Sequence, residues 1–162
     1  MAAAQLSRTE TIPGRILALD YGRRRIGIAV SDELRITAQP LETLEHVNRQ
    51  KDVQRVREIA RKHQARKILV GHPVHLNGVP GEMEEEAARF ARRLGKELGI
   101  PVELVDERLT SWEAAQSVAE TRPASPRSSK TGKREALDHV AAAVMLREYL
   151  DRERANPKDK DD

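Results

Sequence analysis

The chain has 162 residues, which suits a single domain with its own hydrophobic core. Charged residues make up 34% of the chain, aromatic residues 2%, and the formal net charge is +3. This balance permits nucleic-acid binding but argues against an aromatic base-stacking platform, and the absence of cysteine excludes disulfides, thiolate metal sites and a cysteine nucleophile.

The N-terminal segment has neither a helical nor a strand pattern. Residues 1–14 end at Pro13-Gly14, and we expect them to form a flexible arm. They are too short and too polar for a secretory signal, and no apolar run in the chain approaches the ~20 residues of a membrane span. We therefore expect a soluble cytoplasmic protein, a monomer or a homodimer, with no membrane partner.

Residues 15–32 predict two strands joined by a tight turn. The apolar run at 16–19 is typical of a buried strand, Asp20 closes it, and Gly22 supplies the turn. The second strand has a large apolar face and a small one, which are Ile26, Ile28 and Val30 against Gly27 and Ala29. The small face lets another element come close to the backbone.

Asp20 stands at the tip of the first strand, where little water reaches it. A charge held there needs a cation or a metal partner, whereas the alternative is an aspartate that only forms the turn. The strand pattern leaves both interpretations open.

The rest of the chain predicts helices alternating with strands. The predicted elements are a strand at 35–39 stopped by Pro40, a helix at 48–64, a strand at 67–71, a helix at 82–98, a strand at 102–105, a short helix at 110–120 and a helix at 134–150. Residues 41–48 are ambiguous, 121–133 form a mobile basic loop, and 151–162 a disordered tail. We expect an α/β fold over residues 15–150, in which a mixed five-stranded sheet of three antiparallel strands followed by parallel crossovers carries helices on both faces.

Three carboxylates are candidates for a shared site: Asp20, Glu107 just after the last strand, and Asp138 within the apolar final helix. The carboxyl ends of parallel strands share one edge of a sheet, where functional sites collect. Carboxylate oxygens without a Cys or His cluster suit Mg²⁺ or Mn²⁺, which can activate water for attack on a phosphate. Helical periodicity alone leaves open that Asp138 lies on the solvent edge of its helix.

Four motifs in order resemble the YqgF/RuvX family of Holliday-junction-resolvase-like proteins, which are regarded as pre-16S ribosomal RNA nucleases. They are residues 18–32, Val70-Gly71-His72-Pro73 with Asn77-Gly78, residues 105–111, and residues 138–143. The resemblance covers roughly residues 15–150. It departs from the family pattern at Ala18, where the family has glycine, and at His72, where the family has an apolar residue.

The resemblance implies an RNase H-like fold and metal-dependent cleavage of a phosphodiester, with Asp20, Glu107 and Asp138 as catalytic metal ligands. The expected partner is nucleic acid: a ribosomal RNA precursor first, and branched DNA as the enzymatic alternative. A non-catalytic nucleic-acid-binding module is the rival of another class. Because side chains alternate along a strand, only one of Asp106 and Glu107 points into the site, and we choose Glu107.

Basic residues near these carboxylates are candidate phosphate contacts. Arg25 is expected to pair with an acid in the fold, whereas His72 either touches substrate or faces solvent, and solvent is favoured. The candidate substrate-binding residues are Arg23, Arg24, Arg108, Thr110, Lys130, Lys133 and Arg134, with Arg122 and Arg127 of the basic loop completing a clamp on the nucleic-acid backbone.

Overall fold

The computed structural model describes residues 13–72, 81–106 and 130–156, with the side chains of the last segment described from Asp138 onward. Its elements are β1 (Arg15–Tyr21), β2 (Arg25–Ser31), β3 (Ala38–Glu45), α2 (Arg49–Lys62), β4 (Ala65–His72), α3 (Glu82–Leu98), β5 (Val102–Asp106) and α5 (Lys130–Ala155). None of the described helices is long and apolar enough to cross a membrane.

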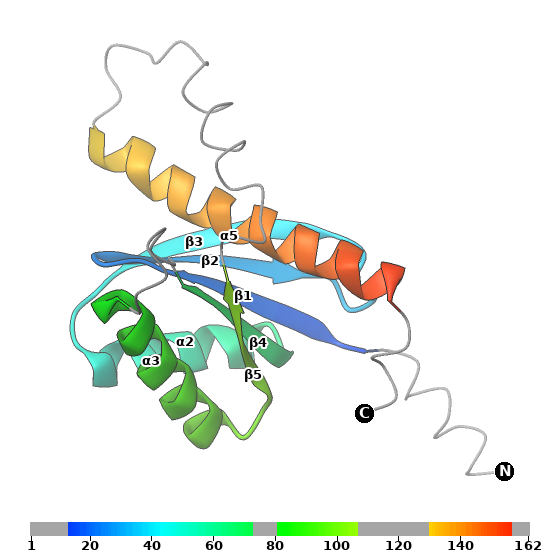
Figure 1. Ribbon diagram of the computed structural model, residues 1–162, viewed down its shortest axis with the longest axis horizontal. Coiled ribbons are helices and arrows are strands. Elements are labelled where there is room, and N and C mark those ends of the chain that lie inside the picture. The colour runs from blue at the N-terminus through cyan, green and yellow to red at the C-terminus, as the bar shows by residue number, and fades with distance from the viewer. Residues whose placement is uncertain (1–12, 73–80, 107–129, 157–162) are drawn as a thin grey trace, which may run out of the picture.

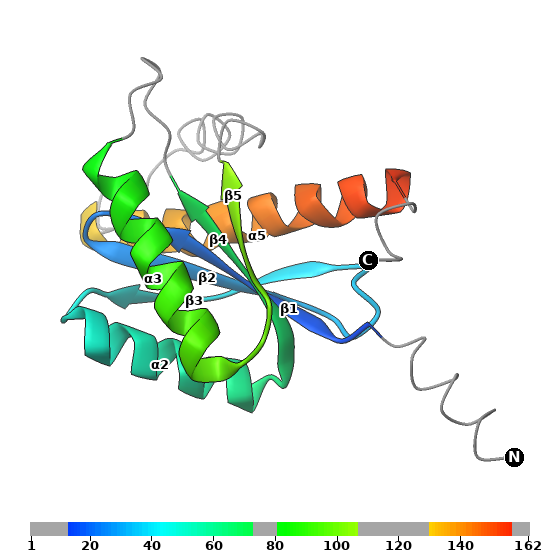
Figure 2. The same ribbon diagram turned by 60° about the horizontal axis from the view of Figure 1, so that its bottom comes forward.

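The strands form one mixed sheet in the order β3-β2-β1-β4-β5. β1 pairs with β2, and β2 with β3, in antiparallel fashion, whereas β1, β4 and β5 run parallel. Helix α5 covers one face of the sheet, and α2 and α3 cover the other, as Figures 1 and 2 show from two directions. The predicted α/β fold class is confirmed.

Two apolar layers hold these helices on the sheet. The large apolar faces of β1 and β2 pack with α2 and α3, where Phe90 and Leu94 are fully buried. On the other face Ala18 and Ala29 pack with Ala142 of α5, beside larger residues such as Leu69 and Leu146. The difference between the two faces of β2 is the one that its alternating sequence predicts.

Local signals set the helix boundaries. The side chain of Asn48 accepts a hydrogen bond from the backbone N–H of Lys51 at 2.8 Å and so caps α2. α3 spans the predicted residues and ends at Gly99, whose φ of 68° is a left-handed conformation that favours glycine.

The predicted bounds of the third strand, 35–39, are wrong at both ends, since β3 begins at Ala38. Pro40 does not stop a strand, because β3 runs from Ala38 through Glu45 and includes most of the ambiguous segment. β3 is an edge strand, where a residue without an N–H is tolerated, and its register with β2 shifts beside Pro40.

Helix α5 is longer than predicted at both ends. It begins at Lys130, inside the predicted loop, and continues through Ala155, into the predicted tail. The N–H groups of Arg154 donate to the carbonyls of Arg35 and Ile36, which fixes the last turn against the loop before β3. The predicted helix at 110–120 and residues 1–12 of the predicted arm lie outside the described residues.

Candidate active site at the carboxyl end of β1

Asp20 lies in the middle of a transverse row of residues that pair from strand to strand. From one edge of the sheet to the other, the row is Thr43, Gly27, Asp20, Gly71 and Val105. Asp20 is the only carboxylate in the row, and a glycine stands on each side of it. The central acid of the sheet therefore has neighbours without side chains.

The alternation of β1 decides which face Asp20 belongs to. Leu17 and Leu19 pack in the layer with α2 and α3, whereas Ile16 and Ala18 pack in the layer with α5. Asp20 continues the second set, so it lies on the face that α5 covers. It is partly exposed, as expected at the end of the buried strand.

The two glycines beside Asp20 are the points where α5 comes closest to the sheet. A β-carbon on Gly27 would collide with the backbone carbonyl of Asp138, and one on Gly71 would collide with the Sδ atom of Met145. The helix therefore passes over the row of Asp20, with Asp138 above the strand next to it.

Asp138 lies on the sheet side of α5, which settles the question left open by helical periodicity. Its Oδ2 atom lies 3.8 Å from Nη1 of Arg25, and the two side chains are 33% and 14% exposed. The next residue, His139, forms a 2.8 Å hydrogen bond through Nδ1 with the hydroxyl of Thr43 on β3. The prediction that Arg25 pairs with an acid of the fold is confirmed.

The described chain thus brings two of the three predicted carboxylates to one patch. Within residues 13–72, 81–106 and 138–156, no three Asp, Glu or His side chains are grouped closely enough to hold a metal ion. Glu107, Arg108 and Thr110, together with Arg122 and Arg127, lie outside the described residues. Lys130, Lys133 and Arg134 fall in the first turns of α5, where the structure describes the backbone only.

Of Asp106 and Glu107, only Asp106 lies within the described residues, so the structure shows the face on which Asp106 lies. Val105 packs in the layer with α5, so Asp106, the next residue along β5, lies on the opposite face. Asp106 is thereby removed from the patch of Asp20.

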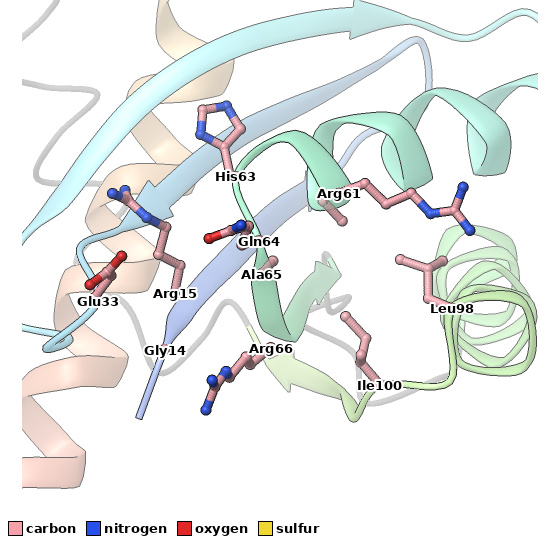
Figure 3. Close-up of a pocket in the computed structure, with 11 residues that line it drawn as sticks. Gly14, Arg15, Glu33, Arg61, His63, Gln64, Ala65, Arg66, Leu98 and Ile100 are labelled. Atoms are coloured by element: carbon pink, nitrogen blue, oxygen red, sulfur yellow. The ribbon is translucent and has the colours of Figure 1, made fainter. Parts of the chain in front are cut away.

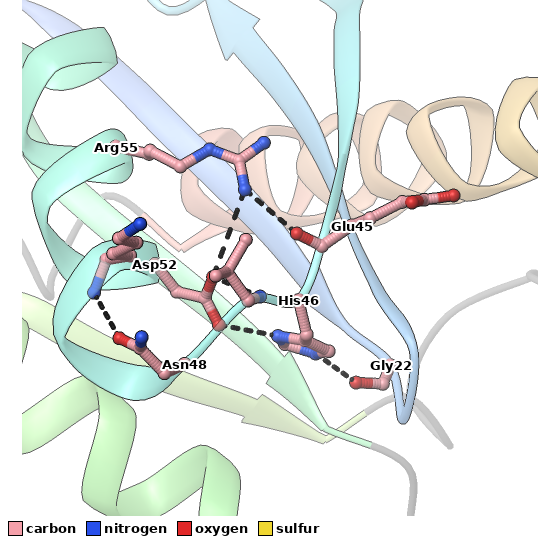
Figure 4. A network of polar contacts seen from close by, with 8 residues as sticks. Gly22, Glu45, His46, Asn48, Asp52 and Arg55 are labelled. Carbon is pink, nitrogen blue, oxygen red and sulfur yellow. Dashed lines mark hydrogen bonds and ion pairs between the residues drawn. The ribbon is translucent and has the colours of Figure 1, made fainter.

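The turn between β1 and β2 carries Arg23 and Arg24, both exposed, next to Asp20. His46, the residue that follows β3, holds this turn in place. Its backbone N–H donates to the carbonyl of Arg24 at 3.0 Å, and its Nε2 atom donates to the carbonyl of Gly22 at 2.8 Å (Figure 4). The Nδ1 atom of His46 lies 2.8 Å from Oδ2 of Asp52 in the first turn of α2.

Sequence reasoning missed His46 and Asp52. The carbonyl of Gly22 only accepts hydrogen bonds, so Nε2 of His46 is the donor in that contact. Asp52 is 3% exposed, and its Oδ1 atom also accepts from the backbone N–H of Val47 at 3.1 Å. The signal that could have identified Asp52 is its position among the buried apolar residues of α2, where an acid needs a hydrogen-bond partner.

The RuvX family model, described as a Holliday junction resolvase, matches residues 14–152. The chain belongs to the RuvX family.

Relatives and a solved structure extend the comparison. A relative from Koribacter versatilis is 41% identical over 91% of this chain and 93% of its own length, and one from Syntrophus aciditrophicus is 42% identical over 85% and 88%; both carry the name "Putative pre-16S rRNA nuclease". The structure of T. thermophilus RuvC in complex with a Holliday junction substrate is 17% identical, with a TM-score of 0.54, and covers 85% of this chain and 95% of that one. That likeness confirms the RNase H-like fold.

His72, where this RuvX chain departs from the motif, does not face solvent, so the favoured prediction is wrong. It is 9% exposed, and its Nδ1 atom, which has no hydrogen-bond partner, lies 4.0 Å from Oε1 of Glu84 on α3. The alternation of β4 explains this placement, because Val70 and His72 point away from the face of Asp20.

Proposed function

We propose that this RuvX protein is a nuclease that hydrolyses phosphodiester bonds at the patch formed by Asp20 and Asp138. The proposal is supported above all by one relationship: the backbone of Asp138 lies over Gly27, and Gly27 is the strand partner of Asp20. Glu107 is the third proposed catalytic residue, since it follows Asp106 and alternation along β5 would return it to the face of Val105.

The donor chemistry of this patch fits a divalent metal ion. Asp20 and Asp138 offer carboxylate oxygens, the ligands that Mg²⁺ and Mn²⁺ prefer, and Glu107 would add a third. Asp20 is partly buried and is flanked by Gly27 and Gly71. Larger side chains at these two positions would occupy the space that a metal ion needs beside the carboxylate. The described part of the chain contributes Arg25 as the cation already beside Asp138.

In the proposed reaction, a metal ion and the two aspartates have separate roles. A bound Mg²⁺ or Mn²⁺ would supply Lewis-acid activation of water and of the scissile phosphate. Asp20 is fixed in position by pairing on both sides of its strand, and Asp138 by its ion pair with Arg25. Arg23 and Arg24 project from a turn that His46 immobilises, so they are placed to bind phosphates beside the reacting one.

The proposed substrate surface extends to residues beyond this patch. These are Arg108, Thr110, Lys130, Lys133 and Arg134, which follow β5 or open α5. Because α5 crosses the sheet above Asp20, cations in its first turns stand at the same end of the molecule as Arg23 and Arg24.

A matched set of variants tests the site. Asp20→Asn and Asp138→Asn should each reduce cleavage of a labelled RNA by at least about 100-fold, while Asp151→Asn, on the exposed side of the same helix, should cleave at the parent rate. Parent-like cleavage by Asp20→Asn would remove the assignment. Calorimetry with Mn²⁺ should give heat of binding that Asp138→Ala abolishes and Asp151→Ala retains.

The substrate we favour is the 5′ end of the pre-16S rRNA in the cytoplasm, and the name shared by the relatives supports it. The description of the family model favours branched DNA as a second candidate. Incubation with a pre-16S fragment and a four-way DNA junction at equal metal concentration separates the two. Depletion in cells should leave unprocessed 16S precursor with intact recombination in the first case, and no cleavage of either substrate would indicate a non-catalytic binding module.

A further inference from the structure

The end of the sheet away from Asp20 contains a pocket that the proposed catalytic site does not use. It has a volume of about 620 Å³ and forms where the start of β1, the end of α2, the start of β4 and the end of α3 meet (Figure 3). Asp20 lies five residues further along β1 than Arg15, which lines this pocket, so about 17 Å separate the two sites.

The pocket combines an apolar lining with several cationic residues, whose side chains extend in different directions (Figure 3). Ala60, Ala65, Leu98 and Ile100 supply the apolar part. The charged and titratable lining residues are Arg15 from β1, Arg61 and His63 at the end of α2, Arg66 from β4 and the single carboxylate of Glu33. Arginine exceeds carboxylate here by three to one, so the pocket favours an anion.

The side chain of Arg66 is exposed, and its aliphatic part lies against the backbone of Gly14. Gly14 has a φ of 87°, and a β-carbon on it would collide with the aliphatic carbons of Arg66, so this side chain lies against a bare backbone. Gly14 is itself fixed, because its N–H donates to the carbonyl of Glu33 at 3.0 Å and its carbonyl accepts from Nε of Arg35 at 2.9 Å.

We propose that this pocket binds a nucleoside phosphate unit, with the base on the apolar lining and the phosphate on the arginines. A volume of this size falls within the range of small-molecule sites. Leu98 and Ile100 pack against the core and leave part of their apolar surface exposed in the pocket. A nucleoside would cover that part, whereas a bare inorganic anion would not. An arginine also offers a flat face on which a base can stack.

The unit has two sources: a nucleotide within an RNA strand that also reaches the catalytic site, or a free nucleotide. The binding itself does not depend on the proposed nuclease activity, so it can be measured whether or not the protein cleaves. The two sources share their chemistry and differ in whether a longer strand binds more tightly.

Titration of the full chain with adenosine 5′-monophosphate, followed by NMR, tests the proposal. We expect the amide signals of Gly14, Arg61 and Ala65 to shift with a saturable dependence on ligand. Arg61→Ser and Arg66→Ser should each weaken binding at least about tenfold, whereas Arg89→Ser, an exposed arginine of α3 outside the pocket, should leave it unchanged. Shifts confined to the Asp20 face, or equal affinities in all three variants, would overturn the proposal.

Two further titrations identify the ligand. Inorganic phosphate should bind more weakly than the nucleotide, and equal affinity would overturn the role of the apolar lining. A single-stranded RNA of about 20 nucleotides, bound to the Asp20→Asn protein to prevent cleavage, should show a salt dependence that Arg66→Ser reduces if the strand is the source. An affinity for RNA that is independent of Arg66, together with nucleotide binding that depends on it, identifies the free nucleotide.

Discussion

Gly27 lies directly beneath the backbone of Asp138. Its partner across the β1–β2 pair is Asp20, so a residue without a side chain separates the two acids of the proposed site. The nitrogen of His139 would lie 2.9 Å from a β-carbon at this position, so the contact is with helix backbone and not with a side chain that could turn away.

Gly27→Ala should therefore destabilise the protein and impair catalysis together. A β-carbon would push α5 off the sheet, at about 1–3 kcal/mol, and would displace Asp138 from Asp20. A shift of that kind at a catalytic group lowers cleavage by about 100-fold. Urea unfolding and an RNA-cleavage assay measure the two effects.

Gly95→Ala is the matched control for Gly27→Ala. Gly95 lies within α3, where a new β-carbon would meet only Cγ2 of Val102 at 3.7 Å, an ordinary contact. Alanine should stabilise this helix by about 0.5–1 kcal/mol and leave cleavage unchanged. Equal stabilities of the two variants would contradict the close approach of α5 at Gly27.

The close approach of α5 was predictable because its signals are local. The alternation of large and small residues in β2 marks the face that a helix can approach, and the alanines beside Asp138 mark the helix that approaches it. The boundaries near Pro40 and at the ends of α5 could not be predicted from local sequence. They depend on the position of a strand in the sheet and on contacts such as that of Arg154 with Ile36. Tertiary context overrides local propensity at those points.

The candidate site divides in the same way. The position of Asp20 at the end of a buried strand could be predicted from the strand pattern, which left its role open. The placement of Asp138 required the resemblance to a family or the packing on Gly27. His46 and Asp52 were missed because each is unremarkable in its own segment. Their role arises only when β3, α2 and the turn at Gly22 meet, and no spacing in the sequence encodes that meeting.

Asp52→Asn should lower the free energy of unfolding by about 1.5–3 kcal/mol. The amide has half the acceptors of the carboxylate, so either the ring of His46 or the N–H of Val47 loses its partner in a buried place. Glu58→Gln, an exposed change on the same helix, should stay within about 0.5 kcal/mol of the parent. Thermal and urea unfolding give both values, and faster amide exchange in the turn at Gly22 should accompany the first variant alone.

Tyr149→Phe tests the polar contact that fixes α5 over β4 and β5. The hydroxyl of Tyr149 accepts from Nζ of Lys67 at 2.6 Å and donates to Oε2 of Glu103 at 2.9 Å. Its loss should cost about 1 kcal/mol, because these groups are only partly buried.

The Tyr149→Phe effect should also depend on pH. Burial alone would raise the pKa of Glu103, but hydrogen bonds from Lys67 and Tyr149 outweigh burial and lower this pKa below its ordinary value. A lowered carboxyl pKa stabilises the fold above the ordinary value and ceases to do so as pH falls through the lowered one. Urea unfolding curves of parent and variant should therefore differ near neutral pH and converge in acid, and a constant difference would contradict the assigned cause.

His63 lines the pocket at the end of the sheet away from Asp20. Burial, followed by the nearby charges of Lys62 and Arg15, lowers the pKa of His63 below its ordinary value, and Glu42 opposes them. The unfolded chain then binds the proton more tightly, so folding stability rises with pH between the lowered pKa and about 6.5.

Arg15→Ser should raise the pKa of His63 toward the ordinary value, because it removes one of the two neighbouring cations, and should narrow that pH interval. Arg89→Ser, which removes a cation that is not among the causes of the shift, should leave the titration of His63 unchanged. Titration of the His63 ring protons by NMR measures the pKa directly in all three proteins. If the pKa of His63 does not change in Arg15→Ser, the charge of Arg15 does not act on His63. The proposed anion site would then depend on Arg61 and Arg66 alone.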